Sequence, residues 1–303
     1  MNYPESVEMV EVGPRDGLQN EPHLIATADK LALIQRAIDA GARRVEVASF
    51  VNPHKVPQMA DADEVCAGLP MRDDVTYIGL VMNLRGAERA IATGRIHQLG
   101  AVSVSTDQFA MANQGQSSDG SVAAASDIIR LANRSGLTAQ VTIGASFGCP
   151  FEGEVDPDRV VAMAKKLVEA GPVEIALADT IGVADPLHVE RLVARVKAAV
   201  APLPVRVHFH NTRGTGLANV WAAIGAGASV IDASLGGLGG CPFAKGAAGN
   251  VATEDVAYML ARAGIGTGLD LDRLIDAGRW LGEIMEKPMP SMVSRAGGFP
   301  KKE

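Results

Sequence analysis

Two histidines stand two residues apart at the end of an apolar run, VRVHFHNTRG at residues 205–214. Successive side chains of a strand point to opposite faces, so His208 and His210 would share one face with Arg206. At a rise of about 3.3 Å per residue the two imidazoles stand about 7 Å apart and can converge on one ion. An isolated pair of this kind is more often structural, so a metal site needs further ligands from elsewhere in the chain.

Oxygen ligands that would complete such a site occur near both ends of the chain. Asp16 follows a short apolar run, and Asn250 follows a glycine-rich segment. One carboxylate, two imidazoles and one amide oxygen leave room for substrate oxygens on a six-coordinate divalent ion, which favours Mg²⁺ or Mn²⁺ over structural zinc. Asp before Gly is also a common turn pattern, which is the alternative for Asp16 taken alone. The predicted metal ligands are Asp16, His208, His210 and Asn250.

Two charged residues indicate what reaction the ion would assist. Arg15 precedes Asp16, and a guanidinium can stabilise a developing oxyanion or bind a carboxylate, although most Arg residues of a protein make surface salt bridges. Glu46 ends a buried strand, where an unpaired carboxylate would be destabilising. We therefore expect Glu46 to pair with Arg15 or with another cation.

The segment 236–249 is rich in glycine, so its backbone can take positive φ and move. It lacks the G-x-G-x-x-G spacing and the ribose-binding acid of a dinucleotide site. We interpret it as a lid that carries Cys241 and Lys245. Cys241, close to cationic groups, could donate or accept a proton, and the alternative is a small loop residue without chemistry. Cys66 and Cys149 are expected to be structural.

The elements that would bring these residues together alternate along the chain. Short runs rich in β-branched residues are followed by longer runs of helical period, and eight such pairs can be counted. The expected strands span 7–12, 44–47, 75–81, 98–103, 138–144, 173–177, 205–210 and 229–233. The expected helices span 27–40, 57–68, 85–94, 121–135, 156–170, 185–200, 214–227 and 253–263.

Eight strand–helix pairs predict an α/β fold, a (β/α)8 TIM barrel, with a doubly wound parallel sheet as the alternative. A barrel gathers its chemistry at the carboxyl ends of its strands, where the residues singled out above occur. No Pro/Ser-rich linker interrupts the chain. We expect a catalytic barrel domain over 1–268 and a helical extension over 269–303 that packs on it, because the latter contains the amphipathic run LDLDRLIDAGRWLGEIME.

The composition argues against two classes of partner. The chain has 303 residues, of which 47% are apolar and 21% charged, and a formal net charge of -7, so we expect neither a nucleic-acid nor a membrane partner. No apolar run approaches the ~18 residues that would cross a bilayer, and MNYPESVEMVEVGPRDG does not resemble a signal or transit peptide. A cytoplasmic location is therefore expected. The three cysteines lack C-x-x-C pairing, which argues against a disulfide framework or a thiolate zinc site.

Five segments carry a resemblance to a known family. They are EVGPRDGLQNE (11–21), VEVASFVNPHKVPQM (45–59), SFGCPFEGEV (146–155), ADTIGVADP (178–186) and GLGGCPFAKGAAGNVATED (237–255). Together they resemble the 3-hydroxy-3-methylglutaryl-CoA lyase family over nearly the whole chain, and the Gly-Cys-Pro lid is highly specific. Isopropylmalate and homocitrate synthases, in the wider superfamily, share the R-D-G-x-Q and H-x-H motifs but lack the cysteine lid.

The resemblance implies a divalent-metal lyase with an acyl-CoA thioester substrate. It would cleave 3-hydroxy-3-methylglutaryl-CoA, or a close 3-hydroxyacyl-CoA analogue, to acetyl-CoA and a 3-oxo acid such as acetoacetate by retro-Claisen chemistry. That reaction belongs to leucine degradation and ketone-body formation. The resemblance also implies a homo-oligomer, either a dimer or a tetramer.

Matching motif positions carry the roles of the family onto this chain. Asp16, His208, His210 and Asn250 would bind the metal ion, either Mg²⁺ or Mn²⁺. Arg15 would stabilise the enolate, Glu46 would support the metal ligands, and Cys241 would lie on the lid that closes over the acyl group, with Cys241 or His210 ready for proton transfer. Weaker matches, expected to orient their neighbours, are Gln19, Ser49, Asp179 and Glu254.

Two features depart from the family pattern. After the second histidine the lyases usually continue with Asp-Thr, whereas this chain has Asn211-Thr212 followed by the cation Arg213, and Asn at that position resembles the condensing synthases. The segment 105–121 also diverges, although Asn113 is retained, and it would frame the acyl pocket. A substrate with a longer 3-substituent or a citramalyl-like skeleton therefore stays open. So do an acetyl-CoA-dependent condensing transferase and a non-catalytic binding protein as alternative functions.

Overall fold

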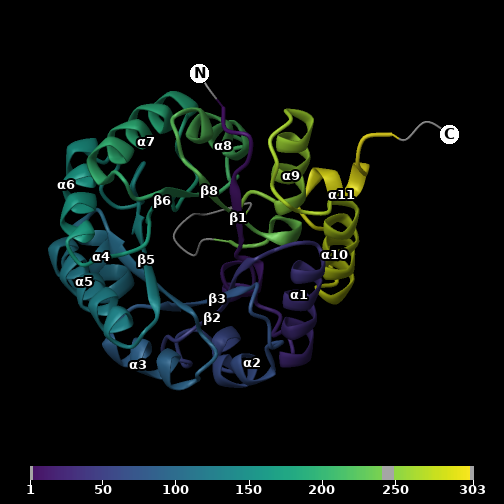
Figure 1. Ribbon diagram of the computed structural model, residues 1–303, viewed down its shortest axis with the longest axis horizontal. Coiled ribbons are helices and arrows are strands. Elements are labelled where there is room, and N and C mark those ends of the chain that lie inside the picture. Colours follow the sequence, from purple (N-terminus) through teal and green to yellow (C-terminus); the bar gives the residue numbers. More distant parts are fainter. Residues whose placement is uncertain (1–2, 241–248, 301–303) are drawn as a thin grey trace.

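Eight parallel strands form a closed barrel within residues 3–240 and 249–300, the part of the chain that this computed structural model describes. The strands are β1 (Glu8–Glu11), β2 (Arg44–Ser49), β3 (Thr76–Val81), β4 (Gln98–Val104), β5 (Thr138–Gly144), β6 (Ile175–Asp179), β7 (Val205–Phe209) and β8 (Val230–Ala233). They pair in this order, and β8 pairs with β1 to close the ring (Figure 1). The predicted (β/α)8 TIM barrel is confirmed, and the doubly wound alternative is wrong.

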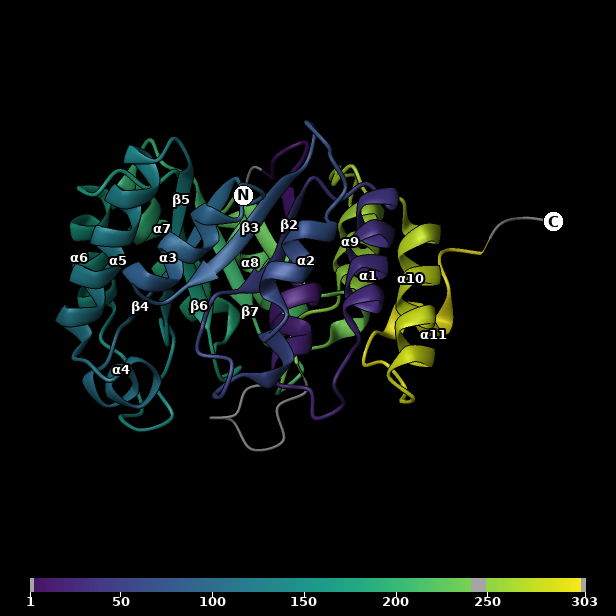
Figure 2. The same ribbon diagram turned by 90° about the horizontal axis from the view of Figure 1, so that it is seen from below.

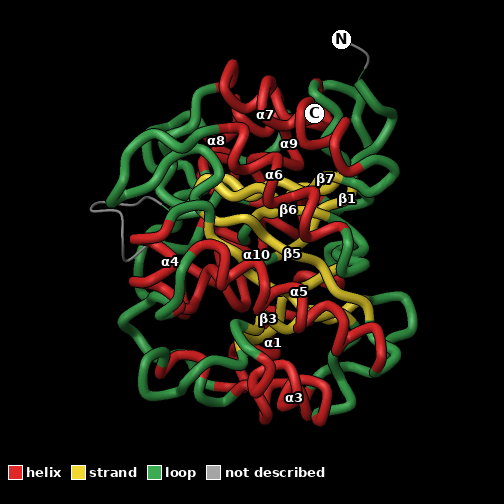
Figure 3. The backbone as a smooth tube through the Cα atoms, turned by 90° about the vertical axis from the view of Figure 1, so that its left-hand side faces the viewer, coloured by secondary structure: helices red, strands yellow, loops and turns green. Residues whose placement is uncertain are grey.

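Helices surround the barrel, which Figure 3 shows as an inner layer of strands enclosed by helices. The helices that follow the strands are α1 (Thr27–Asp39), α2 (Ala62–Gly68), α3 (Leu84–Ala92), α5 (Ser118–Arg134), α6 (Pro157–Val168), α7 (Pro186–Val200), α8 (Gly216–Gly225) and α9 (Thr253–Arg262). Each overlaps a helix expected from the sequence. The expected helix over 57–68 is wrong in its first part, where a 3-10 turn, η2 (Pro57–Met59), precedes α2. Asp61 lies between the two and binds Thr27 and Lys30 of α1.

A short helix that sequence reasoning missed, α4 (Asp107–Gln114), follows β4 at the carboxyl end of the barrel. It buries only Phe109 and Ala110, too few apolar positions to give a helical period. Its first residue is held by a polar contact instead, since Asp107 accepts a hydrogen bond from the backbone N–H of Ser118. The last turn ends at Gly115, which takes the left-handed conformation.

The interior of the barrel is partly apolar and partly charged. All residues of β7 are buried, as expected for a strand covered on both faces. Val205, Val207 and Phe209 join the apolar core, whereas Arg206 and His208 occupy the alternate positions. A separate apolar cluster is formed by Val10, Val12, Ile78 and Val230. Charged groups therefore fill space that branched apolar side chains fill in most barrels.

The C-terminal helices α10 (Leu271–Ile284) and α11 (Met292–Ala296) lie on one side of the barrel, beside α1 and α9 (Figure 2). Asp255 at the start of α9 accepts hydrogen bonds from the Ser291 hydroxyl and from the backbone of Met292 and Val293. Glu254 accepts from the backbone N–H of Gly236 and from the Ser294 hydroxyl.

The division into domains 1–268 and 269–303 stays a prediction. No helix of the described residues is long and apolar enough to span a bilayer.

Burial of Glu254 gives a prediction for stability against pH. Burial raises the pKa of this carboxyl to about 8, from 4.5, against the opposing effect of its hydrogen bonds. The folded chain therefore binds this proton more tightly than the unfolded chain does. The stability that the protonated carboxyl contributes is complete below about pH 4.5 and is lost as the pH rises through about 8.

We expect Glu254→Gln to flatten the fall in the free energy of unfolding between pH 5 and pH 8, because the amide is neutral throughout. The part of this fall that Glu254 causes amounts to about 1.4 kcal/mol of the free energy of unfolding for each unit by which the pKa values of the folded and unfolded chains differ. Urea unfolding of metal-free protein at several pH values measures it. Glu283→Gln, at an exposed position on α10, is the control. Equal pH slopes for Glu254→Gln and wild type would contradict the prediction.

Candidate active site

The turn that carries Arg15 and Asp16 is η1 (Gly13–Gly17), a π-helical turn directly after β1. Three successive backbone N–H groups, from Arg15 to Gly17, donate to the Val12 carbonyl and tighten the turn. Glycine at its first residue leaves room for the carboxylate of Glu11, since a Cβ at Gly13 would lie 2.5 Å from Oε1 of Glu11. This local constraint directs Arg15 and Asp16 into the mouth of the barrel.

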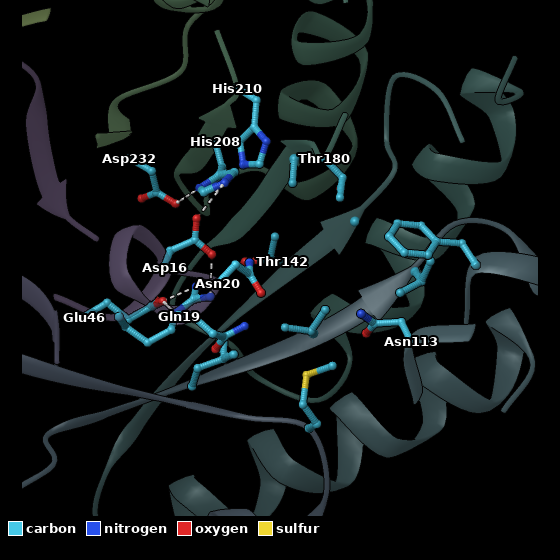
Figure 4. A pocket seen from close by; sticks show the side chains of 18 of the residues that line it. Asp16, Gln19, Asn20, Glu46, Asn113, Thr142, Thr180, His208, His210 and Asp232 are labelled. Carbon is cyan, nitrogen blue, oxygen red and sulfur yellow. Dashed lines mark hydrogen bonds and ion pairs between the residues drawn. The ribbon is translucent and has the colours of Figure 1, made fainter. Parts of the chain in front are cut away.

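Asp16, His208 and His210 meet at the carboxyl ends of β1 and β7 (Figure 4). Their candidate ligand atoms all lie within 4.8 Å of one another. Oδ2 of Asp16 is 3.8 Å from Nε2 of His208, and the two imidazole centroids are 5.2 Å apart. Asn250 donates from Nδ2 to Oδ2 of Asp16 at 2.8 Å. The four predicted metal ligands are therefore brought together.

Unpaired polar atoms test whether this set suits a metal ion. Oδ1 of Asn250 and Nδ1 of His210 are buried and have no hydrogen-bond partner among the described residues. Nδ2 of Asn250 is already used by Asp16 and by the Leu238 carbonyl, so the amide orientation leaves Oδ1 as a free acceptor. A buried acceptor without a donor is destabilising unless another group satisfies it. One carboxylate, two imidazoles and one amide oxygen suit a divalent cation.

The electrostatics keep the carboxylate of this set ionised. Burial opposes ionisation of Asp16, but the nearby Arg15, His208 and His210 outweigh it and hold the pKa of the carboxyl well below its usual range. The two histidines differ from each other. Burial and the neighbouring His208 lower the pKa of His210 to about 4. Burial also acts against protonation of His208, but Asp232 and Asp16 reverse the effect and raise its pKa.

Arg15 is held from two sides. Its guanidinium pairs with the buried carboxylate of Glu46 and, at 2.5 Å, with Oδ1 of Asp16. The structure thus contains the predicted pair between Glu46 and Arg15. Burial alone would lower the pKa of Arg15, but Glu46 and Asp16 raise it, so the guanidinium stays cationic. Arg15 is 8% exposed, and its remaining surface faces the cavity.

A cavity of about 190 Å³ opens beside this cluster. Asp16, His208 and His210 lie on one side of it and Asn113 on the other (Figure 4). Arg15, Glu46, Arg206 and Asp232 also line it. The apolar or uncharged part of the lining includes Leu80, Met82, Val102, Val104, Phe109, Thr142 and Thr180. Gln19 and Asn20, which follow η1, complete the rim. The cavity therefore has one charged wall and one largely apolar wall.

Other predicted residues lie outside the cluster. Ser49 and Asp179 are buried; Asp179 accepts hydrogen bonds from the backbone of Val183 and Ala184. Glu254 binds the C-terminal helix α11. Cys66 and Cys149 are buried free thiols. Cys241 and Lys245 lie outside the described residues.

The two residues that depart from the family pattern make local contacts. Oδ1 of Asn211 accepts from the backbone N–H of Gly216, which lies at the start of α8. Arg213 donates to the carbonyls of Ile181 and Gly182. Both side chains therefore shape the loops after β6 and β7, and neither lines the cavity.

Sequence reasoning missed two charged residues at the floor of the cavity, Arg206 and Asp232. Asp232 of β8 stands opposite His208 of β7 in the sheet register and binds its Nδ1 at 3.0 Å. The signal in the sequence was a charged residue inside the apolar run SVIDASL at 229–235. The pattern already placed Arg206 on the face of His208, but gave no role for it.

Comparisons with known proteins agree with this geometry. A family model described as HMGL-like matches residues 6–281. The (R)-citramalyl-CoA lyase of Chloroflexus aurantiacus is 43% identical over 97% of this chain and 95% of that protein. The 3-hydroxy-3-isohexenylglutaryl-CoA/hydroxy-methylglutaryl-CoA lyase of Pseudomonas aeruginosa is 40% identical over 98% of both chains. A solved structure of an HMG-CoA lyase from Acinetobacter baumannii, in complex with coenzyme A and 3-methylmalate, is 38% identical, has a TM-score of 0.94, and covers 100% of this chain and 99% of that one.

The unpaired nitrogen of His210 gives a prediction for metal binding. We expect His210→Ala to weaken the binding of Mn²⁺ at least tenfold, because it removes one of the ligand atoms that converge on a single point. Electron paramagnetic resonance of free Mn²⁺ measures the affinity. His188→Ala is the matched control, since this ring packs on Phe147 outside the cluster and should leave the affinity unchanged. Equal Mn²⁺ affinities in both variants would show that His210 is not a ligand.

Proposed function

This chain belongs to the HMGL-like family, and from that premise we propose that it is a carbon–carbon lyase of the hydroxymethylglutaryl-CoA lyase type. The reaction is the retro-Claisen cleavage of 3-hydroxy-3-methylglutaryl-CoA, or of a close 3-hydroxyacyl-CoA analogue, to acetyl-CoA and an oxo acid. The oxo acid from the parent substrate is acetoacetate. The observation that carries the proposal is the meeting of Arg15 with Asp16, His208 and His210 at one wall of one cavity.

The cleavage needs three events in sequence. The 3-hydroxyl group loses its proton, the bond between C2 and C3 breaks as the C3 carbonyl forms, and the electron pair moves onto the thioester as an enolate. A proton then adds to C2 and gives acetyl-CoA. The site therefore has to accept one proton, stabilise a new negative charge and return one proton.

The residues that bind the metal ion in this proposal are Asp16, His208, His210 and Asn250. When bound, a divalent ion, Mg²⁺ or Mn²⁺, would lower the pKa of the hydroxyl that it contacts. His210 is neutral at physiological pH, since its pKa is lowered to about 4, so one of its nitrogens is free to accept a proton or bind a cation. Cys241 is the second candidate for proton transfer.

Arg15 supplies the positive charge that the enolate needs. Its pairs with Glu46 and Asp16 fix the guanidinium at the edge of the cavity before substrate arrives, which avoids reorganisation during the reaction. Because both carboxylates keep Arg15 cationic, it can interact with the thioester oxygen as negative charge develops. Glu46 acts through Arg15 and is a positioning residue in this scheme.

The relatives of this chain act on thioesters with different acyl groups, as their names state. The relatives are named for citramalyl, methylglutaryl and isohexenylglutaryl thioesters, which differ in the substituents on C3. The apolar wall around Phe109 and Val102 can take an alkyl substituent, and Asn113 and Thr180 offer hydrogen bonds to a carboxylate. A methylglutaryl skeleton gives a 3-oxo acid, whereas a citramalyl skeleton gives a 2-oxo acid.

Further assignments from the sequence belong to this proposal. They are a cytoplasmic location, assembly into a homo-oligomer, and a place in leucine degradation or ketone-body formation. The alternative of an acetyl-CoA-dependent condensing transferase depended on Asn211, whose side chain accepts a hydrogen bond from the backbone N–H of Gly216 and does not line the cavity. The lyase is therefore the better-supported function.

Release of acetyl-CoA from a panel of thioesters tests the substrate. We expect Mn²⁺-loaded protein to cleave 3-hydroxy-3-methylglutaryl-CoA, and expect EDTA to abolish the activity. (R)-citramalyl-CoA and a 3-isohexenyl analogue, assayed alongside, rank the acyl groups by kcat/KM. No cleavage of any member by folded, metal-loaded protein would contradict the lyase function, and a preference for citramalyl-CoA would replace the parent substrate.

Substitution of Arg15 tests the charge that meets the enolate. We expect Arg15→Gln to lower kcat by about 10²–10³-fold, because an amide cannot stabilise an enolate as a guanidinium does, while Mn²⁺ affinity changes little. Steady-state kinetics with acetyl-CoA detection measures the loss. Arg213→Gln, which removes a cation that donates to the carbonyls of Ile181 and Gly182 and does not line the cavity, is the matched control. A kcat of Arg15→Gln near that of wild type would refute the role.

A further inference from the structure

Six side chains form a closed ring at the floor of the cavity, which we name the charge ring. Its members, in order around the ring, are Arg15, Glu46, Arg206, Asp232, His208 and Asp16. They come from η1, β2, β7 and β8, so the ring exists only in the closed barrel. Carboxylates alternate with guanidinium or imidazole groups all the way around.

One half of the charge ring runs beneath the metal ligands. Oε1 of Glu46 pairs with Arg15, and Oε2 of the same carboxylate lies 3.9 Å from Nη2 of Arg206. Arg206 then donates from Nε to Oδ1 of Asp232 at 2.5 Å. Arg206 is 1% exposed, so its charge is compensated by these carboxylates and by Glu174 instead of by water.

The other half returns through the ligands themselves. Oδ2 of Asp232 is 3.0 Å from Nδ1 of His208, and Nε2 of His208 is 3.8 Å from Oδ2 of Asp16. Oδ1 of Asp16 reaches Arg15 at 2.5 Å and closes the ring. Each carboxylate thus uses its two oxygens for two different neighbours, which fixes its orientation.

The contact between Asp232 and His208 has only one consistent direction. An ionised carboxylate accepts hydrogen bonds and donates none, so Nδ1 of His208 has to carry the proton. Nε2 of the neutral ring then holds its lone pair toward Asp16, at the point where the candidate ligand atoms converge. Arg206 in turn holds Asp232, because it occupies the oxygen that does not face His208.

We propose that Asp232 and Arg206 are positioning residues for the metal-dependent reaction, with Arg206 orienting Asp232 and Asp232 fixing the ring and the tautomer of His208. The contribution to catalysis rests on the proposed function, whereas the tautomer follows from the ring alone. Through Glu46, the same guanidinium also reaches Arg15. The charge ring therefore connects Arg15, the cation proposed to stabilise the enolate, to His208, a proposed metal ligand.

Glu174 provides a matched control because it shares Arg206 but not the site. Its carboxylate binds Nη1 of Arg206 at 3.2 Å and both terminal nitrogens of Arg44. It contacts neither His208 nor Arg15 in the described structure. Glu174→Gln therefore removes one counter-ion of Arg206 and leaves Asp232, the partner of His208, in place.

Metal titration of two isosteric variants tests the proposal. In Asp232→Asn, an NH2 group, which donates hydrogen bonds, replaces one of the two carboxylate oxygens. If the NH2 group faces Arg206, two donors oppose each other. If it faces His208, it favours the tautomer whose proton is on Nε2. We expect Asp232→Asn to weaken Mn²⁺ binding about 10–100-fold. We expect Glu174→Gln to change it less than threefold. Equal losses in the two variants, or a loss below threefold in Asp232→Asn, would overturn the proposal.

A measurement on the wild-type protein tests the tautomer without any variant. We expect ¹⁵N NMR of metal-free protein, at a pH where the ring is neutral, to place the His208 proton on Nδ1. A proton on Nε2 would overturn the proposal, even if Asp232→Asn does not fold. This result is separate from the proposed function, since absence of thioester cleavage or of Mn²⁺ binding by wild type would contradict that function and leave the tautomer unaffected.

Discussion

The compensation of charge inside the barrel is the constraint on which the rest of the site depends. Removing an ion from water costs several kcal/mol unless a counter-ion and hydrogen bonds replace the water. Glu46, Glu174 and Asp232 are all at least 96% buried, and each contacts a guanidinium. Arg206 contacts all three carboxylates, so its position is set by β2, by β8 and by the residue that precedes β6.

Because each of these charged side chains has more than one partner, the groups of the site are held in place without apolar packing. A buried ion pair contributes little net stability, but breaking it by removing one partner is strongly destabilising. The charged interior therefore favours one arrangement of side chains over others more than it adds to the stability of the fold. For His208, which we propose as a metal ligand, orientation is the property that matters, since ligands are effective only when their lone pairs converge.

Another buried carboxylate, that of Glu11, joins the beginning of the chain to its later part. Glu11 accepts hydrogen bonds from the backbone of Gly13 and Leu235 and from the hydroxyl of Thr253. It thus ties η1 to the loop after β8 and to the first residue of α9. Asn250 can donate a hydrogen bond to Asp16, far from it in sequence, because Glu11 holds η1 close to the start of α9.

The sequence predicted the parts of the site that depend on local pattern. Alternation placed His208 and His210 on one face of a strand, and the cost of an unpaired carboxylate correctly predicted a partner for Glu46. The strands and most helices followed from periodicity, whereas α4 was missed because it buries too few apolar residues. Asp232 and Arg206 were missed for another reason. Their partners are set by the register between β7 and β8 and by closure of the barrel, which no local window of sequence contains.

The two walls of the cavity differ in how strongly their side chains depend on one another. The charged wall is built from strand ends whose side chains bind one another in a closed ring, so a change in any member disturbs its two neighbours. The opposite wall includes Phe109 and Asn113 of α4, a short helix after β4 with few buried contacts of its own. Substitutions on α4 can alter the shape of the cavity without disturbing a buried charge. Under the proposed function, substitutions on α4 would therefore change the choice of acyl group, while the groups of the charged wall keep their positions.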